Sequence, residues 1–481
     1  MVTGLDLQQA EHRGIAVYSK ALLRALRESG AELWLLTDFE PKLTGSSLKA
    51  APRGVKRLVF AARVLESLRQ GYPPRPFPLA SSRAVGRLPM LMKLLRGWQV
   101  LEDLGAMVFR GSYNLERAKA IDLAELQDSP YSRVERLFYL DELSGIISAR
   151  NVFVNSFRAA LRKQAKPIRI QLGSFDGLIT TCPLHLRIED SKSFVQTVHD
   201  LIPLEFVQTT DHAGAFSRRL ASCNQAQRLF VSSSTRQKYE ACFEHHASTT
   251  SAVVIQPPSL QMPKPHQRRL LESDVLHPSR RAKANGNTLH AFRYLLFNSS
   301  VEPRKNLLFV IRAYRQSGLA EQGIRLCVTG QLKRDDYSKA VAEQADDSVL
   351  LTGYIDEQTK ANLFLHTLGV LSPSLVEGFG IPVLDAACIG APVIASPSLS
   401  HREIQGLHDF QSRVWICDTR DPMDWAVAMK DLTRAQLLQI KNPKQEREMR
   451  LERYEELNQR IAEDFRLTVC QQVLNGIQDR A

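Results

Sequence analysis

Two adjacent cations follow an apolar run in the carboxyl-terminal half of the sequence. The run RYLLFNSS (293–300) predicts a buried strand, and Arg304 and Lys305 come soon after it, before an amphipathic segment that begins at Asn306. A helix that begins there turns free backbone N–H groups toward the same loop. A guanidinium, an ammonium group and these N–H groups can together bind a diphosphate. The alternative is a pair of ordinary solvated surface charges.

A second loop, SPSLVEGFGIP (372–382), carries more specific chemistry. Gly378 and Gly380 let the backbone approach a ligand closely, and the proline that ends the loop suits the first turn of a helix. Glu377 stands just before that turn, where its carboxylate can accept hydrogen bonds from sugar hydroxyls. Asp385 falls in the first turn and could reach a ribose. The alternative is a glycine-rich turn in which Asp385 only complements the helix dipole.

The amino-terminal half offers one candidate side chain and one candidate glycine. The segment FVQTVHDLIPLEF (194–206) predicts a short apolar strand that ends at His199 and Asp200. A lone histidine is more often a satisfied structural residue than a reactive one. Gly14 stands in a polar loop before a predicted amphipathic helix that ends near Leu26.

Regular alternation of strands and helices must position these residues. Apolar runs and amphipathic segments alternate beyond residue 288, which predicts a parallel sheet with helices on both faces. Further apolar runs near residues 194, 229 and 252 predict buried parallel strands in the amino-terminal half. Ligands of such sheets bind beyond the carboxyl ends of the strands, so we expect chemistry in the loops after Ser300 and Ser374.

Four regions follow from the composition along the chain. We expect an amino-terminal domain over residues 1–270, with an insertion over about residues 41–170 that is basic and helix-prone. Residues 262–287 are rich in proline, basic and polar residues, and we place the linker between the domains at 271–288. We expect a second domain over 289–460 and a final helix over 461–481 that packs back on the amino-terminal domain.

Composition and charge exclude several classes of protein. A chain of 481 residues, 44% of them hydrophobic, suits two large α/β domains and excludes a single small binding module. The net charge of +12 is scattered and not interleaved with aromatic residues, so we expect no nucleic-acid partner. The 7 cysteines form no C-x-x-C pair, and no apolar stretch approaches a membrane span. We therefore expect a cytoplasmic protein without a disulfide framework or a cysteine zinc site.

The ordered motifs of residues 297–406 resemble the carboxyl-terminal domain of the family 4 (group 1) retaining glycosyltransferases. The pieces that carry the resemblance are EPRKN (302–306), LTGYIDE (351–357), SPSLVEGFGIPVLDAACIGAPVIAS (372–396), Glu403 and Gly406, with VHDLIPLEF (198–206) and GIAVYSKALLRAL (14–26) in the other half. The resemblance implies the GT-B architecture, an α/β fold of two facing Rossmann-like domains with doubly wound parallel sheets.

By this resemblance, the carboxyl-terminal domain (289–460) binds a nucleoside diphosphate sugar as the donor, and the amino-terminal domain (1–270) is the acceptor side. The implied donor-binding residues are Arg304, Lys305, Gly378, Phe379, Gly380, Asp385 and Gly14. Glu377 would bind the sugar hydroxyls, and His199 would face the sugar and the β-phosphate from the other domain, so these two are the implied catalytic residues. The family usually has glutamate where Asp385 stands, and its first loop often carries more glycine than the segment around Gly14.

The resemblance implies a hexosyltransferase. We expect it to move a sugar, with mannose favoured, from a nucleoside diphosphate sugar to a saccharide or lipid-linked acceptor with retention, in polysaccharide or glycan biosynthesis. The sugar nucleotide is a co-substrate, and we expect no other cofactor and no metal, because Arg304 and Lys305 can stabilise the charge on the departing phosphate. A nucleotide-sugar epimerase or hydrolase on the same scaffold, or a non-catalytic donor-binding subunit, stays open.

A short segment suggests contact with an anionic membrane at the inner membrane face. Residues 87–98, read as a helix beyond Pro89, stack three leucines and Trp98 along one stripe, with Lys93 and Arg96 beside it. Burial of the apolar side chains and attraction of the basic side chains to anionic lipids would then both favour binding to the membrane surface. An ordinary core-facing helix has the same pattern.

Overall fold

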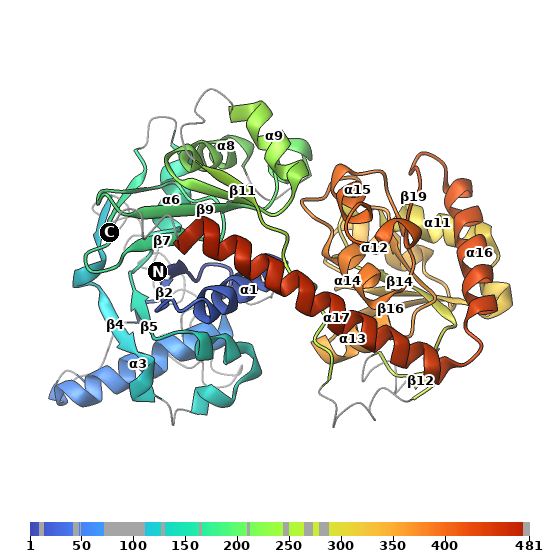
Figure 1. The fold of residues 1–481 in the computed structure, drawn as a ribbon, viewed down its shortest axis with the longest axis horizontal. Coiled ribbons are helices and arrows are strands. Elements are labelled where there is room, and N and C mark those ends of the chain that lie inside the picture. The colour runs from blue at the N-terminus through green and yellow to red at the C-terminus, as the bar shows by residue number, and fades with distance from the viewer. Residues whose placement is uncertain are drawn as a thin grey trace, which may run out of the picture.

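A computed structural model describes residues 1–8, 14–41, 48, 50–71, 111–126, 130–162, 166–208, 212–243, 250–263, 273–278 and 288–474. In this part of the chain, two α/β domains lie side by side and are bridged by one long helix, α17 (Pro443–Val469) (Figure 1). The predicted helical segment at 87–98 and most of the predicted linker lie outside the described residues.

The amino-terminal domain is built on a sheet of mostly parallel strands. Its strands are β1 (Val2–Thr3), β2 (Trp34–Thr37), β4 (Lys119–Asp122), β5 (Gly145–Ser148), β7 (Gly177–Thr180), β9 (Ser193–Val198), β10 (Gln227–Phe230) and β11 (Ser251–Val253). Within the described residues their order is β11-β10-β9-β7-β1-β2-β5-β4. Only the edge pair β4 and β5 is antiparallel among them. A smaller parallel sheet contains β3 (Ser112–Asn114), β6 (Ile168–Gln171) and β8 (Leu186–Ile188).

Helices surround this sheet. They are α1 (Gly14–Glu28), α3 (Arg53–Gln70), α6 (Val152–Leu161), α7 (Ile202–Glu205), α8 (Ala213–Ser222) and α9 (Ser233–Phe243). The predicted amphipathic helix after Gly14 is confirmed as α1, because its apolar residues recur at helical spacing and are buried. The strand that ends before His199 is confirmed as β9, and all six of its residues are buried.

The prediction of an insertion over 41–170 is wrong for the last part of that range. Strand β5 pairs in parallel with β2, with Leu36 beside Ile147, and α6 follows it in the same domain. Ile146 and Ile147 are buried, so this segment belongs to the core of the domain. The basic, helix-prone composition of the surrounding residues hides a strand of only four residues.

The carboxyl-terminal domain has the predicted alternation. Its strands are β14 (Tyr294–Asn298), β15 (Arg325–Thr329), β16 (Val349–Gly353), β17 (Gly369–Ser372), β18 (Val393–Ala395) and β19 (Val414–Ile416). All neighbours in the order β16-β15-β14-β17-β18-β19 are parallel. The helices are α11 (Leu307–Ser317), α12 (Asp336–Gln344), α13 (Glu357–Leu365), α14 (Ile381–Ile389), α15 (Leu399–Gln405), α16 (Pro422–Gln439) and α17.

Alternate residues of β14 show that both faces of this sheet are covered. Tyr294 and Leu296 pack in a buried cluster with residues of α13, α14 and α17. Leu295 and Phe297 pack on the other face, with α11 and α16. Strands buried on both faces read as continuous apolar runs, which is the pattern of this half of the sequence. The predicted doubly wound sheets of the GT-B architecture are therefore confirmed.

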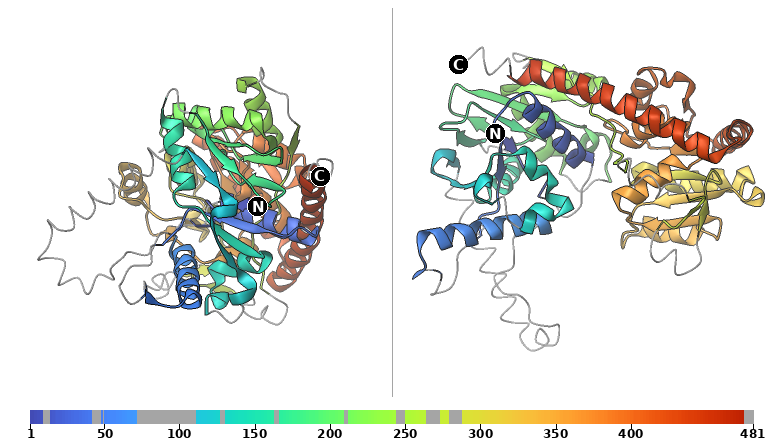
Figure 2. Two further views of the ribbon diagram at one scale, coloured as in Figure 1. Left: turned by 90° about the vertical axis from the view of Figure 1, so that its left-hand side faces the viewer. Right: turned by 60° about the horizontal axis from the view of Figure 1, so that its bottom comes forward.

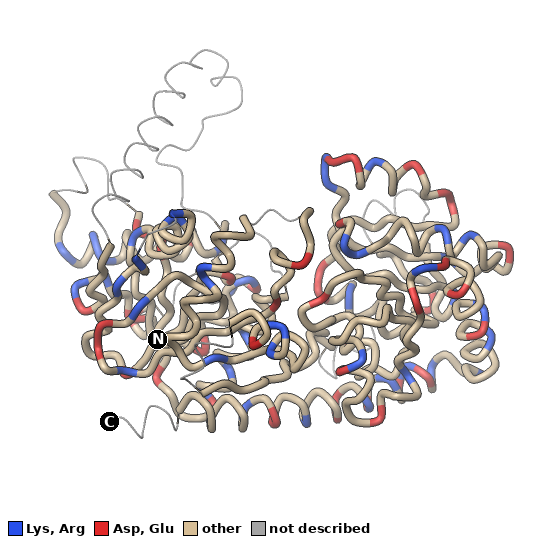
Figure 3. Tube along the Cα trace, turned by 90° about the horizontal axis from the view of Figure 1, so that it is seen from above, with Lys and Arg blue, Asp and Glu red and all other residues tan. Residues whose placement is uncertain are grey.

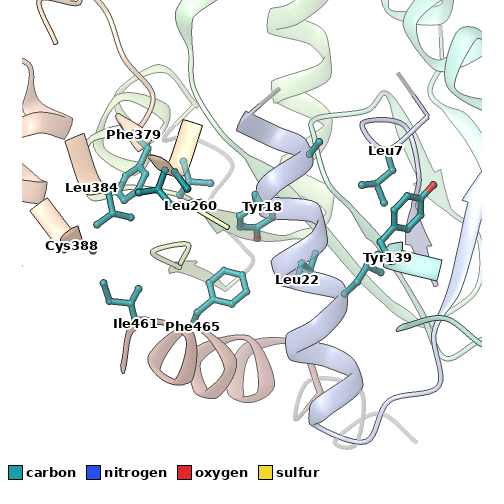
Figure 4. Close-up of a cluster of buried hydrophobic side chains, with 14 of the residues drawn as sticks. Leu7, Tyr18, Leu22, Tyr139, Leu260, Phe379, Leu384, Cys388, Ile461 and Phe465 are labelled. Atoms are coloured by element: carbon teal, nitrogen blue, oxygen red, sulfur yellow. The ribbon is translucent and has the colours of Figure 1, made fainter. Parts of the chain in front are cut away.

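Helix α17 joins the two domains. It leaves the carboxyl-terminal domain and runs along the amino-terminal one without a break at residue 460 (Figures 1 and 2). Phe465 packs edge-on against Tyr18 of α1 with ring centroids 5.8 Å apart, while Ile461 lies nearer to Leu384 and Cys388 of α14 (Figure 4). The last turns of α17 thus contact the amino-terminal domain, and the helix begins at Pro443, far before residue 461.

The connection between the domains also contacts the carboxyl-terminal domain before the predicted linker. The hydroxyl of Tyr454 in α17 donates to the Leu260 carbonyl oxygen at 2.7 Å. Part of the predicted linker forms β12 (Val275–Leu276), which pairs antiparallel with β13 (Leu289–His290).

Charged residues of both signs are interspersed over the two domains (Figure 3). No helix among the described residues has the length and apolar character that a membrane crossing requires.

Candidate active site

The two loops singled out in the sequence meet at one edge of the carboxyl-terminal sheet. Strands β14 and β17 are parallel neighbours, so the loops that follow them emerge side by side. The backbone N–H of Leu375 donates to the Arg304 carbonyl oxygen at 2.8 Å and ties the loops together. A short 3₁₀ turn, Pro303–Lys305, leads through Asn306 in a left-handed conformation (φ 56°) into α11. Asparagine tolerates this conformation better than most residues.

Lys305, Arg304 and Glu377 form a buried ionic cluster. Lys305 Nζ donates to Glu377 Oε1, and the side chains of these residues are 8% and 9% exposed. Arg304 Nη1 lies 3.8 Å from Glu377 Oε2. Ser374 Oγ donates to Glu377 Oε1 at 2.8 Å. The predicted diphosphate cations and the predicted sugar-binding carboxylate are therefore in direct contact.

The cations keep Glu377 ionised. Burial alone would raise the pKa of its carboxyl, but Lys305, Arg304 and His401 outweigh burial and lower the pKa to about 2. Glu377 is therefore an anion and an acceptor of hydrogen bonds throughout the physiological pH range.

Two further charged side chains support Arg304, and the sequence interpretation missed them. Glu302 Oε2 accepts from Arg304 Nε at 3.1 Å, and Lys333 Nζ donates to Glu302 Oε1 at 2.8 Å. Arg304 Nη1 is buried and has no hydrogen-bond partner among the described residues. The three cations and two carboxylates of this group, counted with Lys305 and Glu377, carry one net positive charge. An anionic ligand would therefore be attracted here, and Arg304 has an N–H to offer it.

The loop 377–380 then enters α14. Gly380 has φ 102°, a left-handed conformation that favours glycine, and a Cβ there would meet the His401 ring at 2.9 Å. The side chain of Phe379 is buried in the core that joins the domains (Figure 4). A Cβ on Gly378 would lie 2.5 Å from the His199 carbonyl oxygen. This glycine allows the two domains to touch beside Glu377.

His199 faces this loop from the other domain. Its Nε2 lies 2.7 Å from the Thr181 carbonyl oxygen, and a carbonyl can only accept, so Nε2 carries the proton. Burial lowers the pKa of His199 to about 4, against the opposing effect of the Thr181 carbonyl. The neutral ring therefore presents Nδ1 as a hydrogen-bond acceptor. The Tyr18 ring packs edge-on against it at 4.9 Å between centroids.

Gly14 also lies at the boundary between the domains. A Cβ on Gly14 would meet Cδ1 of Ile381, the first residue of α14, at 2.9 Å. Gly14 thus lies against the start of α14. Its contact with a ligand stays a prediction.

Asp385 is engaged by the segment that connects the domains. Its Oδ1 accepts from the Ser259 backbone N–H and its Oδ2 from Ser259 Oγ, both at 2.5 Å. Burial raises the pKa of Asp385 to about 6, although nearby Lys360 and both Ser259 donors oppose the rise. A ribose would have to share or displace these two hydrogen bonds. The ribose role of Asp385 therefore stays a prediction, and sequence reasoning gave no signal for Ser259.

Comparisons with known proteins point to one class of enzyme for the carboxyl-terminal domain. The family model of glycosyl transferases group 1 matches residues 280–453. The O-antigen chain mannosyltransferase B of Escherichia coli is 30% identical over 118 residues, which are 24% of this chain and 31% of that protein. The chain thus spans about a third of the length of this curated relative.

The solved structures to which the chain shows a distant similarity include two glycosyltransferases. WaaG, described as a glycosyltransferase involved in lipopolysaccharide biosynthesis, is 10% identical with a TM-score of 0.47, over 96% of this chain and 97% of WaaG. A glycosyltransferase from Rickettsia africae ESF-5 is 13% identical with a TM-score of 0.46, over 71% of this chain and 88% of that one.

Proposed function

We propose that the protein is a group 1 glycosyltransferase that takes a nucleoside diphosphate sugar as its donor. One observation carries the proposal. Glu377 is a buried, ionised carboxylate between Lys305 and Arg304, at the carboxyl ends of two parallel strands and beside the backbone of His199. The family match over residues 280–453 supports the same class of enzyme.

The chemistry follows from where charge develops. When the bond between the sugar and the β-phosphate oxygen breaks, the sugar gains positive charge and the departing diphosphate gains negative charge. Arg304 and Lys305 stabilise the phosphate, and the amino-terminal end of α14 adds its partial positive charge. Glu377 accepts hydrogen bonds from sugar hydroxyls. Nδ1 of neutral His199 accepts one from the opposite side.

The proposal also specifies the stereochemistry of transfer, the independence of a metal and the type of sugar. Retention of configuration, membership of family 4 and independence of a metal come from the resemblance, with the cations at Arg304 and Lys305 in the place of a divalent ion. The name of the Escherichia coli relative supports a mannose-type donor, on a stretch of 118 residues.

A saccharide or lipid-linked acceptor completes the proposed reaction, which would take place in the cytoplasm or at the inner membrane face. Co-sedimentation with anionic liposomes at low and high salt tests membrane contact, and salt-sensitive binding abolished by Leu91→Glu with Leu95→Glu would support it. No binding at low salt would reject membrane contact.

The decisive experiment separates donor binding from transfer. A thermal-shift panel of nucleoside diphosphates identifies the base, because a ligand that binds the native state raises its melting temperature. Release of nucleoside diphosphate from matching sugar donors, with and without saccharide acceptors, then measures turnover. Release that depends on an acceptor supports a transferase. Acceptor-independent conversion would instead support the epimerase or hydrolase, and binding without turnover the non-catalytic subunit.

A further inference from the structure

The peptide carbonyl that follows Glu377 is held by the opposite domain. The Gly378 carbonyl oxygen accepts from Ser232 Oγ at 2.8 Å and lies 3.2 Å from Thr235 Oγ1. Ser232 and Thr235 are 0% and 2% exposed. Ser232 directly precedes α9 and Thr235 lies in its first turn, whereas Gly378 belongs to the donor loop. The two domains thus share buried hydrogen bonds next to the candidate sugar-binding carboxylate.

Thr235 also reaches the second candidate catalytic residue. Its Oγ1 lies 3.2 Å from the His199 carbonyl oxygen. A hydroxyl has one proton, so Thr235 donates to one of the two carbonyls at a time. Ser232 Oγ accepts from the Thr235 backbone N–H at 3.0 Å, and its one proton has two acceptors, the Gly378 carbonyl oxygen and Thr235 Oγ1, each at 2.8 Å. Thr235 therefore lies between the backbones that carry His199 and Glu377.

A third contact, made by Glu403, holds the amino-terminal end of α9. Glu403 Oε1 accepts from the backbone N–H of Ser233 at 2.7 Å, and its Oε2 accepts from that of Ser234 at 3.2 Å. These N–H groups begin α9 and have no partner within the helix. A carboxylate is favourable there because the amino-terminal end of a helix carries partial positive charge. Glu403 lies in α15, so this pair also crosses from one domain to the other.

We propose that Ser232 and Thr235 are positioning residues that set the spacing of His199 and Glu377, and that Glu403 is a latch that holds α9 when the domains are closed. The kinetic part of the proposal rests on the proposed function. Lys305 and Arg304 lie with Glu377 in one domain, so donor binding does not need the hydrogen bonds of Ser232 and Thr235, which we call the clamp. Transfer needs the clamp, because its hydroxyls bond directly to the backbones of His199 and of the donor loop.

The first test compares two substitutions of one hydroxyl. Thr235→Val keeps the shape of the side chain and removes the hydroxyl, whereas Thr235→Ser keeps the hydroxyl. We expect Thr235→Val to lower kcat at least about tenfold, while the Kd of the nucleoside diphosphate changes less than about threefold. Thr235→Ser should restore kcat to near the wild-type value. Wild-type kcat in Thr235→Val, or an equal loss in Thr235→Ser, would overturn the positioning role.

The second test needs no enzymatic activity. Hydrogen exchange at the amides of Ser233 and Ser234, and the radius of gyration from small-angle scattering, report the latch in the full chain. Glu403→Gln should speed exchange at these two amides at least about fivefold and increase the radius of gyration. Glu240→Gln, on the same helix and paired there with Arg236, is the control and should change neither.

The two tests also separate this proposal from the proposed function. If the wild-type protein has no transfer activity, the proposed function is rejected, and hydrogen exchange and scattering alone then test the latch role of Glu403. Unchanged hydrogen exchange and an unchanged radius of gyration in Glu403→Gln would overturn that role. A folded Glu403→Gln variant is expected, because Glu403 is only partly buried and the substitution conserves its shape.

Discussion

Two carboxylates on either side of the start of α14 have opposite electrostatic environments. Glu377 contacts two cations, which lower its pKa to about 2 despite burial. Asp385 accepts hydrogen bonds from the neutral donors of Ser259, and burial raises its pKa to about 6 although nearby Lys360 and these donors oppose the rise. Both are buried, so the difference comes from the partners that the fold supplies. A buried carboxylate is ready to bind a sugar as an anion only where cations compensate its desolvation.

The largest expected effect is on Glu377. Glu377→Gln removes the anion, so turnover should fall at least about a hundredfold, the scale seen when a positioned polar group is lost. It also leaves Lys305 buried without its counterion, so the melting temperature should fall, and a nucleoside diphosphate should recover part of that fall by supplying negative charge. Steady-state kinetics and calorimetry check both.

Glu321→Gln, at an exposed position, is the control for this substitution. His199→Ala should lose turnover on a similar scale, because it removes the acceptor opposite Glu377. Full activity in either Glu377→Gln or His199→Ala would remove that residue from the mechanism.

The next largest effect is expected for Arg304, one of the two cations that contact Glu377. Arg304→Ala should weaken nucleoside diphosphate binding more than about tenfold, since a charge-assisted hydrogen bond contributes roughly 1.5 to 3 kcal/mol. Arg334→Ala removes the same charge from an exposed position nearby and should have little effect. Isothermal titration calorimetry measures the affinity of each variant for the nucleoside diphosphate. Equal affinities in the two variants would contradict the role of Arg304.

The smallest effect is the pH dependence of stability. The pKa of Asp385 is raised in the folded state, so its contribution to the free energy of unfolding falls as pH rises from about 4 to about 6. The pKa of Glu377 is lowered, so its contribution is present above about pH 4.5 and is lost as pH falls toward 2.

Denaturant unfolding of the two amide variants between pH 4 and 7 measures this contrast. Asp385→Asn should gain stability relative to the wild type as pH rises through this window. The loss of unfolding free energy in Glu377→Gln, relative to the wild type, should stay nearly constant at pH 5 and above. If the unfolding free energies of the two variants changed with pH in parallel, the two carboxylates would not have the different pKa values described above.

The carboxyl-terminal half could be predicted closely from the sequence. Its strands are buried on both faces, so each appears as a continuous apolar run, such as the one that forms β14. The loops that carry Arg304 and Glu377 follow such runs directly, and parallel strands bring loops of this kind to one edge. In the amino-terminal half, the strand β5 was missed because four residues in a basic, helix-prone stretch give little periodic signal.

The sequence by itself determined the types of the chemical groups and the loops that hold them. It placed His199, Glu377, Arg304 and Lys305 in the segments that follow buried strands, because apolar runs and turn residues define strands and loops locally. Only the tertiary structure decided the partners of these groups. The bonds of Ser259 to Asp385, of Lys333 to Glu302, and of Ser232 and Thr235 to Gly378 join residues far apart in the chain or in different domains. Desolvation and the distance to a counter-charge set each carboxylate's protonation state, and both quantities exist only once the chain has folded.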